Sequence, residues 1–327
     1  MLGSDEGAMT TQQTKTVWLT GASGFIGTHV ADALRHRADL HVLTPRRAEV
    51  DLTDVAVVSS YLERHRPDVV IHLAAAAAGS VQMRRRPVHY GLANLRSAEG
   101  LLAAVERGVV PRLLVAGSAG EYPRLVALGE SPRGLVPSDL WRGAAAAGGY
   151  GQARRLISQW SLDAAKGAGT EAAVLVLPTV YGPGDGGPPP LQTERLRALP
   201  SFAMRMMTSS AVEHWGSGFE QRDFVHVKDV AEAFVAAIDA PIAGMRLHIS
   251  DGRPVQMQEI ARQIADVLGF RGRQRWQHRI EAQQHSEDRV WLEPAGLPTL
   301  GFSPQRQMYE ELGESLDDLR RRLEVSK

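Results

Sequence analysis

Three side chains near the middle of the chain have the types and spacing needed for proton transfer. Ser118 precedes Tyr122 by four residues, and Tyr150 precedes Arg154 by four residues. A phenol, with a pKa of about 10, exchanges protons near pH 7 only when a nearby cation stabilises its ionised form. If Tyr150 begins a helix, Arg154 lies one turn further along the same face and can supply that charge. Alternatively, Tyr150 is an aromatic side chain packed at the start of a helix.

A glycine-rich segment near the start of the chain has the spacing of a phosphate-binding turn. Gly21, Gly24 and Gly27 lie between an apolar run, Val17–Leu19, and a helical pattern, Thr28–Leu34. Glycine permits a sharp turn and the close approach of a ligand, and a helix N-terminus favours a pyrophosphate. A tight turn without a ligand is the simpler alternative, but the strand–turn–helix context favours dinucleotide binding.

The elements that would position these residues alternate between strand and helix patterns. Such alternation predicts an α/β fold with a doubly wound parallel sheet, helices on both faces, and ligands beyond the carboxyl ends of the strands. We expect strands at Thr16–Leu19, Leu40–Leu43, Val69–His72, Arg112–Ala116 and Ala172–Leu177, and helices at Phe25–His36, Val55–Arg64, Asn94–Arg107 and Gly151–Lys166.

The alternation breaks after Pro178. Gly182–Pro190 is rich in Gly and Pro and is expected to be a loop. A strand at Phe224–Val227, a helix at Lys228–Asp239 and a strand at Arg246–Ile249 are expected to return to the sheet. We therefore predict a disordered tail, a dinucleotide-binding domain, and a smaller, discontinuous C-terminal substrate-binding lobe. These parts comprise residues 1–14, residues 15–178 plus 224–250, and residues 179–223 plus 251–327, respectively.

The composition excludes several classes of function. The 327-residue chain has no cysteine and a formal net charge of zero. We therefore expect no disulfides, no metal site, and no attraction to nucleic acid or to an anionic membrane. No apolar run approaches the ~20 residues that span a bilayer, and we expect a cytoplasmic protein.

The order of motifs resembles that of the extended short-chain dehydrogenase/reductase family, which includes sugar-nucleotide epimerases, dehydratases and ketoreductases. The resemblance covers roughly residues 16–320 and implies a Rossmann-type sheet. It rests on the glycine turn and on Asp51-Leu52, His72-Leu73-Ala74-Ala75, Gly117-Ser118, Tyr150, Pro178–Gly184, Arg222–Ala231 and Leu300–Pro304.

The resemblance implies a set of cofactor-binding residues. Asn94 would support the active-site end of the sheet through backbone hydrogen bonds, although a helix cap explains it equally well. Gly21, Ser23, Gly24, Phe25, Ile26 and Gly27 would hold the pyrophosphate, Asp51 and Leu52 would contact the adenine, Leu73, Ala74 and Ala75 would line the cofactor, and Tyr150, Arg154 and Pro178 would complete the site.

The cofactor preference depends on the residues after the second strand. Sites for NAD place an acid there, whereas sites for NADP supply a cation for the 2′-phosphate. This chain has Arg46 and Arg47 in that neighbourhood and no acid in the usual place. NADP(H) is therefore favoured and NAD(H) remains an alternative, as do two solvated arginines without a ligand.

The resemblance also implies catalytic roles. Tyr150 would exchange a proton with the substrate oxygen during hydride transfer, and the Ser118 hydroxyl would polarise the same oxygen. Arg154 stands where the family has lysine. Either Arg154 does most of the work of that lysine, or the site is impaired or repurposed, because a guanidinium is effectively never deprotonated. Substrate contacts would come from Ser80, Val81, Ser118, Thr179 and Arg222.

The reaction is narrowed by two departures from the family. Dehydratases carry an Asp-Glu pair where this chain has Ala119 and Gly120. Glu121 follows one residue after the position of the dehydratase glutamate. The 3,5-epimerase/reductase branch typically uses Cys and His, and this chain has no cysteine. A 4-ketoreductase acting on a nucleotide-activated deoxysugar is therefore favoured. The alternatives are an NAD-dependent 4-epimerase and a non-catalytic dinucleotide-binding protein. Family members often form homodimers through the helix that carries the tyrosine and the helix near Asn94.

Overall fold

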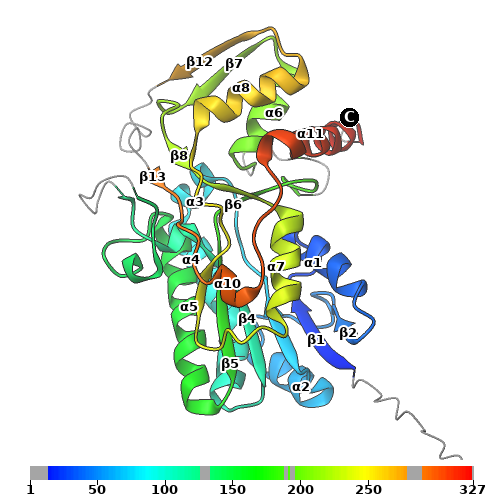
Figure 1. Ribbon diagram of the computed structural model, residues 1–327. Helices are drawn as coiled ribbons and strands as arrows, with labels where there is room; N and C mark the ends of the chain where they lie inside the picture. The colour runs from blue at the N-terminus through cyan, green and yellow to red at the C-terminus, as the bar shows by residue number, and fades with distance from the viewer. Residues whose placement is uncertain (1–13, 126–132, 188–190, 192–195, 278–288, 326–327) are drawn as a thin grey trace, which may run out of the picture.

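A six-stranded parallel sheet forms the centre of the computed structural model (Figure 1), which describes residues 14–125, 133–187, 191, 196–277 and 289–325. The strand order β10-β5-β4-β3-β1-β2 confirms the predicted doubly wound α/β fold. In chain order the strands are β1 (Lys15–Thr20), β2 (Leu40–Leu43), β3 (Val69–His72), β4 (Arg112–Ser118), β5 (Glu171–Leu177) and β10 (Arg246–His248).

Helices cover both faces of this sheet, and each face has its own apolar core. Alternate side chains of a strand point to opposite faces, so Val17 and Leu19 belong to one core and Trp18 to the other. The first core is covered by α1 (Phe25–Arg35) and α7 (Val227–Ala237), and the second by α2 (Val55–His65), α4 (Pro87–Glu106) and α5 (Gly148–Ala168).

A third apolar core lies beyond the carboxyl ends of the strands, in the upper part of Figure 1. It includes Phe202, Ile264 and Leu316, which come from three different helices. These helices are α6 (Ala198–Thr208), α8 (Met257–Leu268) and α11 (Met308–Val325), and beside them β7 (Ala211–Trp215) pairs in parallel with β12 (Arg273–Gln277).

The ends of several elements differ from the sequence-based expectation. The long helix α4 begins at Pro87 and not at Asn94, because proline suits the first turn of a helix and the helical pattern extends back to it. The short helix α3 (Ser80–Arg85) was not predicted. Gly182–Gly187 forms the expected loop, and the rest of that loop and the tail before Thr14 lie outside the described residues.

One strand was assigned to the wrong sheet. β9 (Phe224–His226) does not return to the central sheet but pairs in parallel with β6 (Thr179–Tyr181). Before it, β8 (Gln221–Arg222) pairs with β11 (Val255–Gln256) and with β13 (Arg289–Val290), and α10 (Leu297–Leu300) follows β13. Among the described residues, no helix combines the length and apolar character needed to cross a membrane.

Candidate functional site

The glycine turn between β1 and α1 leaves room for no side chain at two positions. Gly21 has a φ of +73°, and a Cβ added there would lie 2.7 Å from the backbone nitrogen of Ala74. A Cβ on Gly27 would overlap the carbonyl oxygen of Gly21 and lie 2.7 Å from its carbon. Gly24 is the N-cap of α1 and offers no side-chain cap, so the first N–H groups of the helix can bind an anion.

A cavity of about 740 Å³ opens beside this turn. The loops after β1, β2 and β3 form its walls, together with one turn of α4. Its lining includes ten of the predicted cofactor residues: Gly21, Ser23, Gly24, Arg46, Arg47, Asp51, Leu52, Leu73, Ala74 and Ala75. The size and the Gly-rich wall fit a dinucleotide.

Some residues that line the cavity were not predicted from the sequence. They include Thr20, Ala76 and Arg96. Arg96 is an exposed cation on α4, and no motif marks it, because which face of α4 meets the cavity depends on packing. The other predicted cofactor residues, which are not in the lining, are Phe25, Ile26, Gly27, Asn94, Tyr150, Arg154 and Pro178.

Asn94 shapes the cavity wall from behind. Its amide nitrogen donates to the carbonyl of Ala76 at 2.9 Å and to that of Tyr90 at 2.7 Å, and its oxygen accepts from the Ala76 N–H at 3.2 Å. Asn94 lies in the middle of α4, so it is not a helix cap, and its side chain is completely buried. It therefore fixes the loop after β3 through backbone hydrogen bonds.

The two arginines after β2 are exposed at the mouth of the cavity. Arg47 lies 3.5 Å from the carboxylate of Asp51, and the Arg47 side chain is largely in solvent, whereas that of Asp51 is half-buried. The backbone N–H of Arg46 donates to Glu49 at 2.6 Å. The Thr53 N–H and hydroxyl donate to Asp51 and lower the pKa of its carboxyl. This arrangement leaves both guanidiniums accessible to a phosphate from the cavity side.

The structure brings together the elements that carry Ser118 and Tyr150. The Ala147 N–H donates to the carbonyl of Gly120 at 3.1 Å. A Cβ on Gly151 would overlap that same carbonyl oxygen and lie 3.0 Å from its carbon. The first turn of α5, which contains half-buried Tyr150, is therefore packed directly on the turn that follows Ser118.

The side chain of Arg154 is buried against β4, and only 2% of the residue is exposed. Its Nη2 donates to the carbonyl of Ala116 in β4, and its Nη1 has no hydrogen-bond partner among the described residues. Burial, and then the charge of Arg154, lower the pKa of His72 to about 3. His72 is the packed strand-end histidine expected there, bonded through Nδ1 to the Thr20 hydroxyl at 2.9 Å. Arg154 therefore lies at the carboxyl ends of β3 and β4.

The predicted substrate residues fall on separate elements. Thr179 begins β6, and its N–H donates to the carbonyl of Asp223, the residue after Arg222. Arg222 is half-buried in β8 and donates to the carbonyl of Gln221 at 2.7 Å. Ser80 is exposed at the start of α3, and the side chain of Val81 lies outside the described residues. Thr179 and Arg222 are thus close in space, and Ser80 belongs to a separate element, α3.

Asp223 should make folding stability depend on pH. Complete burial raises the pKa of its carboxyl to about 7, although Ser250 and the Leu292 N–H donate to it. Between about pH 4 and pH 7 the folded state therefore holds a proton that the unfolded state has lost, so stability falls as pH rises. Asp223→Asn should remove this pH dependence. As pH rises from about 4 to 7, the free energy of unfolding of the variant should therefore increase relative to that of the wild type, by up to about 1.4 kcal/mol per pH unit.

Urea denaturation of both proteins at pH 5, 6, 7 and 8 measures this difference. The gain should level off above pH 7, where the folded-state carboxyl is also ionised. A constant difference across the series would mean that Asp223 is already ionised at pH 5.

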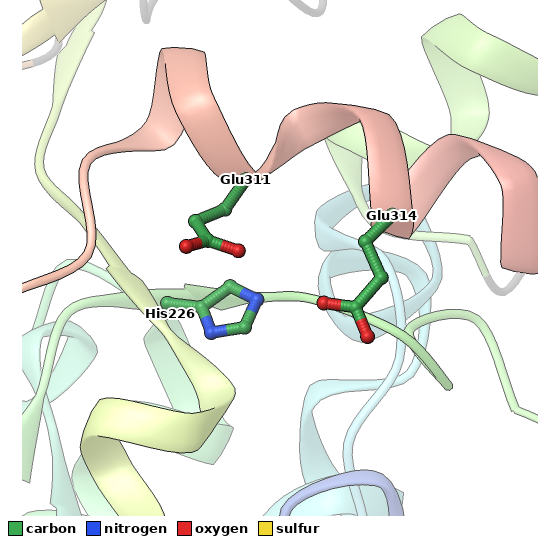
Figure 2. A group of neighbouring side chains, drawn as sticks. All are labelled: His226, Glu311 and Glu314. Carbon is green, nitrogen blue, oxygen red and sulfur yellow. The ribbon is translucent and has the colours of Figure 1, made fainter.

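One group of side chains has the donor atoms of a metal site. Figure 2 shows His226 at the end of β9 beside Glu311 and Glu314 of α11, with one ligand atom from each within 4.8 Å of the others. Both oxygens of Glu314, however, accept from the ammonium of Lys228, at 2.8 and 3.0 Å. The Nδ1 of His226 accepts from the Lys228 N–H, so the ring proton is on Nε2, the nitrogen that faces Glu314. Lys228 therefore supplies the cation in this contact between α7 and α11.

Comparisons with known proteins point to one family. The profile of the NAD dependent epimerase/dehydratase family matches residues 17–249. GDP-L-fucose synthase 1 of Arabidopsis thaliana is 26% identical over 97% of this chain and 96% of its own length. GDP-L-fucose synthase of Escherichia coli (strain K12) is 27% identical over 79% of this chain and 82% of its own length.

Two solved structures share the fold over nearly their whole length. UDP-glucose 4-epimerase of Thermotoga maritima has a TM-score of 0.80 at 21% identity and covers 94% of this chain and 99% of its own. GDP-mannoheptose C4 reductase of Campylobacter jejuni, with NADP bound, has a TM-score of 0.77 at 19% identity and covers 94% of this chain and 98% of its own.

Proposed function

Because this chain belongs to the NAD-dependent epimerase/dehydratase family, within the extended short-chain dehydrogenases/reductases, we propose that it is an NADP(H)-dependent 4-ketoreductase. Its substrate would be a nucleotide-activated 4-keto sugar. The observation that supports this proposal is the packing of the first turn of α5, which carries Tyr150, on the turn that follows Ser118 at the carboxyl end of β4. The names of the relatives favour a GDP-linked sugar.

The residues of the chain would share the work of reduction. A bound NADPH would supply the hydride for the carbonyl carbon of the sugar. Tyr150 would give its phenolic proton to the carbonyl oxygen, and the Ser118 hydroxyl, whose oxygen already accepts from the Gly120 N–H at 3.1 Å, would donate to the same oxygen. Nη1 of Arg154 has no partner among the described residues and would donate to a ribose hydroxyl of the cofactor.

Reduction without epimerisation fits this chain better than a combined reaction. The 3,5-epimerase/reductase branch of the family typically uses a cysteine and a histidine, and this chain contains no cysteine. Dehydration is disfavoured because Glu121, the acid nearest to Ser118, is completely buried and bonded to the backbone N–H of Ser118. A single hydride and a single proton are then all that the site has to deliver.

The proposal also assigns the two ligands to the two parts of the chain. We place the dinucleotide in residues 15–178 plus 224–250 and the sugar nucleotide against residues 179–223 plus 251–327, where the third apolar core supports a separate lobe. A homodimer through α4 and α5 is supported by exposed apolar side chains on these helices, Val88, Leu92 and Trp160. A cytoplasmic location suits a reaction that uses NADPH.

The decay of NADPH absorbance tests the function directly. With a GDP-linked 4-keto-6-deoxysugar, stoichiometric NADPH consumption and formation of the 4-hydroxy sugar are expected. Exchange of two 4-hydroxy isomers of a sugar nucleotide without net consumption would instead indicate a 4-epimerase, which the fold shared with UDP-glucose 4-epimerase permits. Tight NADPH binding without turnover of any sugar would indicate the non-catalytic alternative, in which buried Arg154 has a structural role only.

The cofactor preference should depend on the two arginines at the mouth of the cavity. Replacing both Arg46 and Arg47 with alanine should weaken NADPH binding about 10- to 100-fold, because two charge-assisted contacts to the 2′-phosphate are lost. NADH binding should change by less than about twofold, since NADH has no such phosphate. Fluorescence titration measures both affinities, and Arg64→Ala, an exposed arginine of α2 outside the cavity, is the control. Equal losses for both cofactors would contradict the assignment.

A further inference from the structure

Glu121 is a buried acid directly behind the proposed reaction site. It ends the short 3₁₀ helix Ala119–Glu121 and has no exposed surface. One carboxylate oxygen accepts from the Ser118 N–H at 2.9 Å and from the Ser158 hydroxyl at 3.0 Å. The other lies 3.3 Å from Nη1 of Arg246. The carboxylate therefore links the end of β4 to α5 and to β10.

Three buried arginines interact with Glu121: Arg246 contacts its carboxylate, Arg155 bonds its main-chain carbonyl, and Arg154 acts on it through its charge. Arg154 and Arg155 are 2% and 7% exposed, and the side chain of Arg246 is 8% exposed. Nε of Arg155 donates to the main-chain carbonyl of Glu121 at 2.6 Å. Burial raises the pKa of Glu121 above its usual value, and the charges of Arg246 and Arg154 offset only part of this rise. Buried guanidiniums are costly without a counter-charge, and Glu121 is placed to supply one.

Position 154, close to Glu121, is also where this chain departs from its family. Arg154 takes the place of the family lysine. A guanidinium is larger and planar, and here it is held by the carbonyl of Ala116 in the strand that ends at Ser118. The acid that shares this buried space also bonds the backbone of Ser118. Glu121 is thus hydrogen-bonded to Ser118, and Arg154, which is held two residues earlier in β4, acts on the same carboxylate through its charge.

We infer that Glu121 is a positioning residue, which holds Ser118 through its backbone N–H and provides the counter-charge that lets a buried arginine replace the family lysine at position 154. The inference rests on the proposed function for its catalytic part only. Glu121 itself transfers no proton in this proposal, because it is completely buried and both of its carboxylate oxygens are engaged, one by Ser118 and Ser158 and the other by Arg246.

The counter-charge is tested by thermal unfolding, which needs no activity. Glu121→Gln keeps an oxygen acceptor for Ser118 and Ser158 but removes the charge. It should lower Tm by about 4 °C when Arg154 is present, and by less than half as much in an Arg154→Met background, where one buried cation is gone. Glu106→Gln, an exposed acid at the end of α4, should leave Tm within about 1 °C. The same loss of Tm in both backgrounds would overturn the inference.

The positioning of Ser118 is tested by kinetics. In the NADPH assay, Glu121→Gln should lower kcat about 10-fold with the KM for the sugar nucleotide within about twofold, and it should have no further effect in a Ser118→Ala background. A loss of kcat that persists in Ser118→Ala would show that Glu121 acts otherwise, and an unchanged kcat would also overturn the inference. If the wild type turns over no substrate, the proposed function fails, and the thermal cycle decides the role of Glu121 alone.

Discussion

Replacing Tyr150 with phenylalanine is expected to lower kcat for the keto sugar by about 1,000-fold, while NADPH binding stays within about twofold. Tyr150 is the only titratable side chain in the first turn of α5, which packs on the turn after Ser118, and phenylalanine keeps the ring while removing the proton. NADPH consumption measures the rate, and fluorescence titration measures cofactor affinity. Tyr309→Phe, an exposed tyrosine of α11, is the matched control and should have no effect.

A Tyr150→Phe enzyme with the wild-type rate would show that the proton comes from another group. A loss of both rate and NADPH binding would instead point to damage of the fold. The two outcomes are therefore separated by the binding measurement.

Arg154→Lys is the companion experiment, and we expect turnover to be retained or to rise. Both side chains are cations, and the shorter lysine can donate to a ribose hydroxyl as the family residue does. In the wild type Nη2 is bonded to the carbonyl of Ala116, and Nη1 has no partner among the described residues. A fall of more than about 10-fold would mean that the bond to Ala116 is needed for the site.

Gly27→Ala is expected to weaken NADPH binding by at least about 100-fold, which corresponds to about 2.7 kcal/mol. The new methyl group would overlap the carbonyl oxygen of Gly21 and lie 2.8 Å from the Cα of Ala22, and all of these atoms are backbone. The turn can admit the methyl group only by moving, and it then loses the N–H geometry that binds a pyrophosphate. Isothermal titration with NADPH measures the loss.

Gly167→Ala is the matched control for this substitution. Gly167 lies in α5 and has no atom within 4 Å of an added Cβ, so alanine there should leave NADPH binding unchanged and stabilise the helix by up to about 1 kcal/mol. Normal NADPH affinity in Gly27→Ala would contradict the location of the pyrophosphate in this turn.

The sequence predicted the central sheet well because buried parallel strands are short, continuous apolar runs. β2 and β3 begin and end at the predicted residues. β9 was assigned to the wrong sheet because its apolar residues look the same whichever strand they pair with. Its partner, β6, lies more than forty residues earlier in the chain. Pairing across such a distance depends on how the third core packs, which a local pattern does not contain.

Some residues of the candidate site could likewise be predicted from the sequence, and others could not. The glycine turn was predictable because the requirement for Gly at positions 21 and 27 is set by backbone atoms, which lie a few residues away or directly after β3, the neighbour of β1 in the sheet. Arg96 was missed because only packing decides which face of α4 meets the cavity. Glu121 was excluded as an acid for dehydration, but its bonds to Ser158 and Arg246 join residues 37 and 125 positions apart, which no spacing rule connects.

The contact between Gly151 and Gly120 has a mechanical consequence. Backbone touches backbone there without an intervening side chain, so a shift of the turn after Ser118 must carry the first turn of α5 with it. The two hydroxyls of the proposed site would then keep their separation while the lobe above them opens, closes or is rebuilt. Directed evolution toward other sugars can therefore replace residues of that lobe without changing the distance between the hydroxyls of Tyr150 and Ser118.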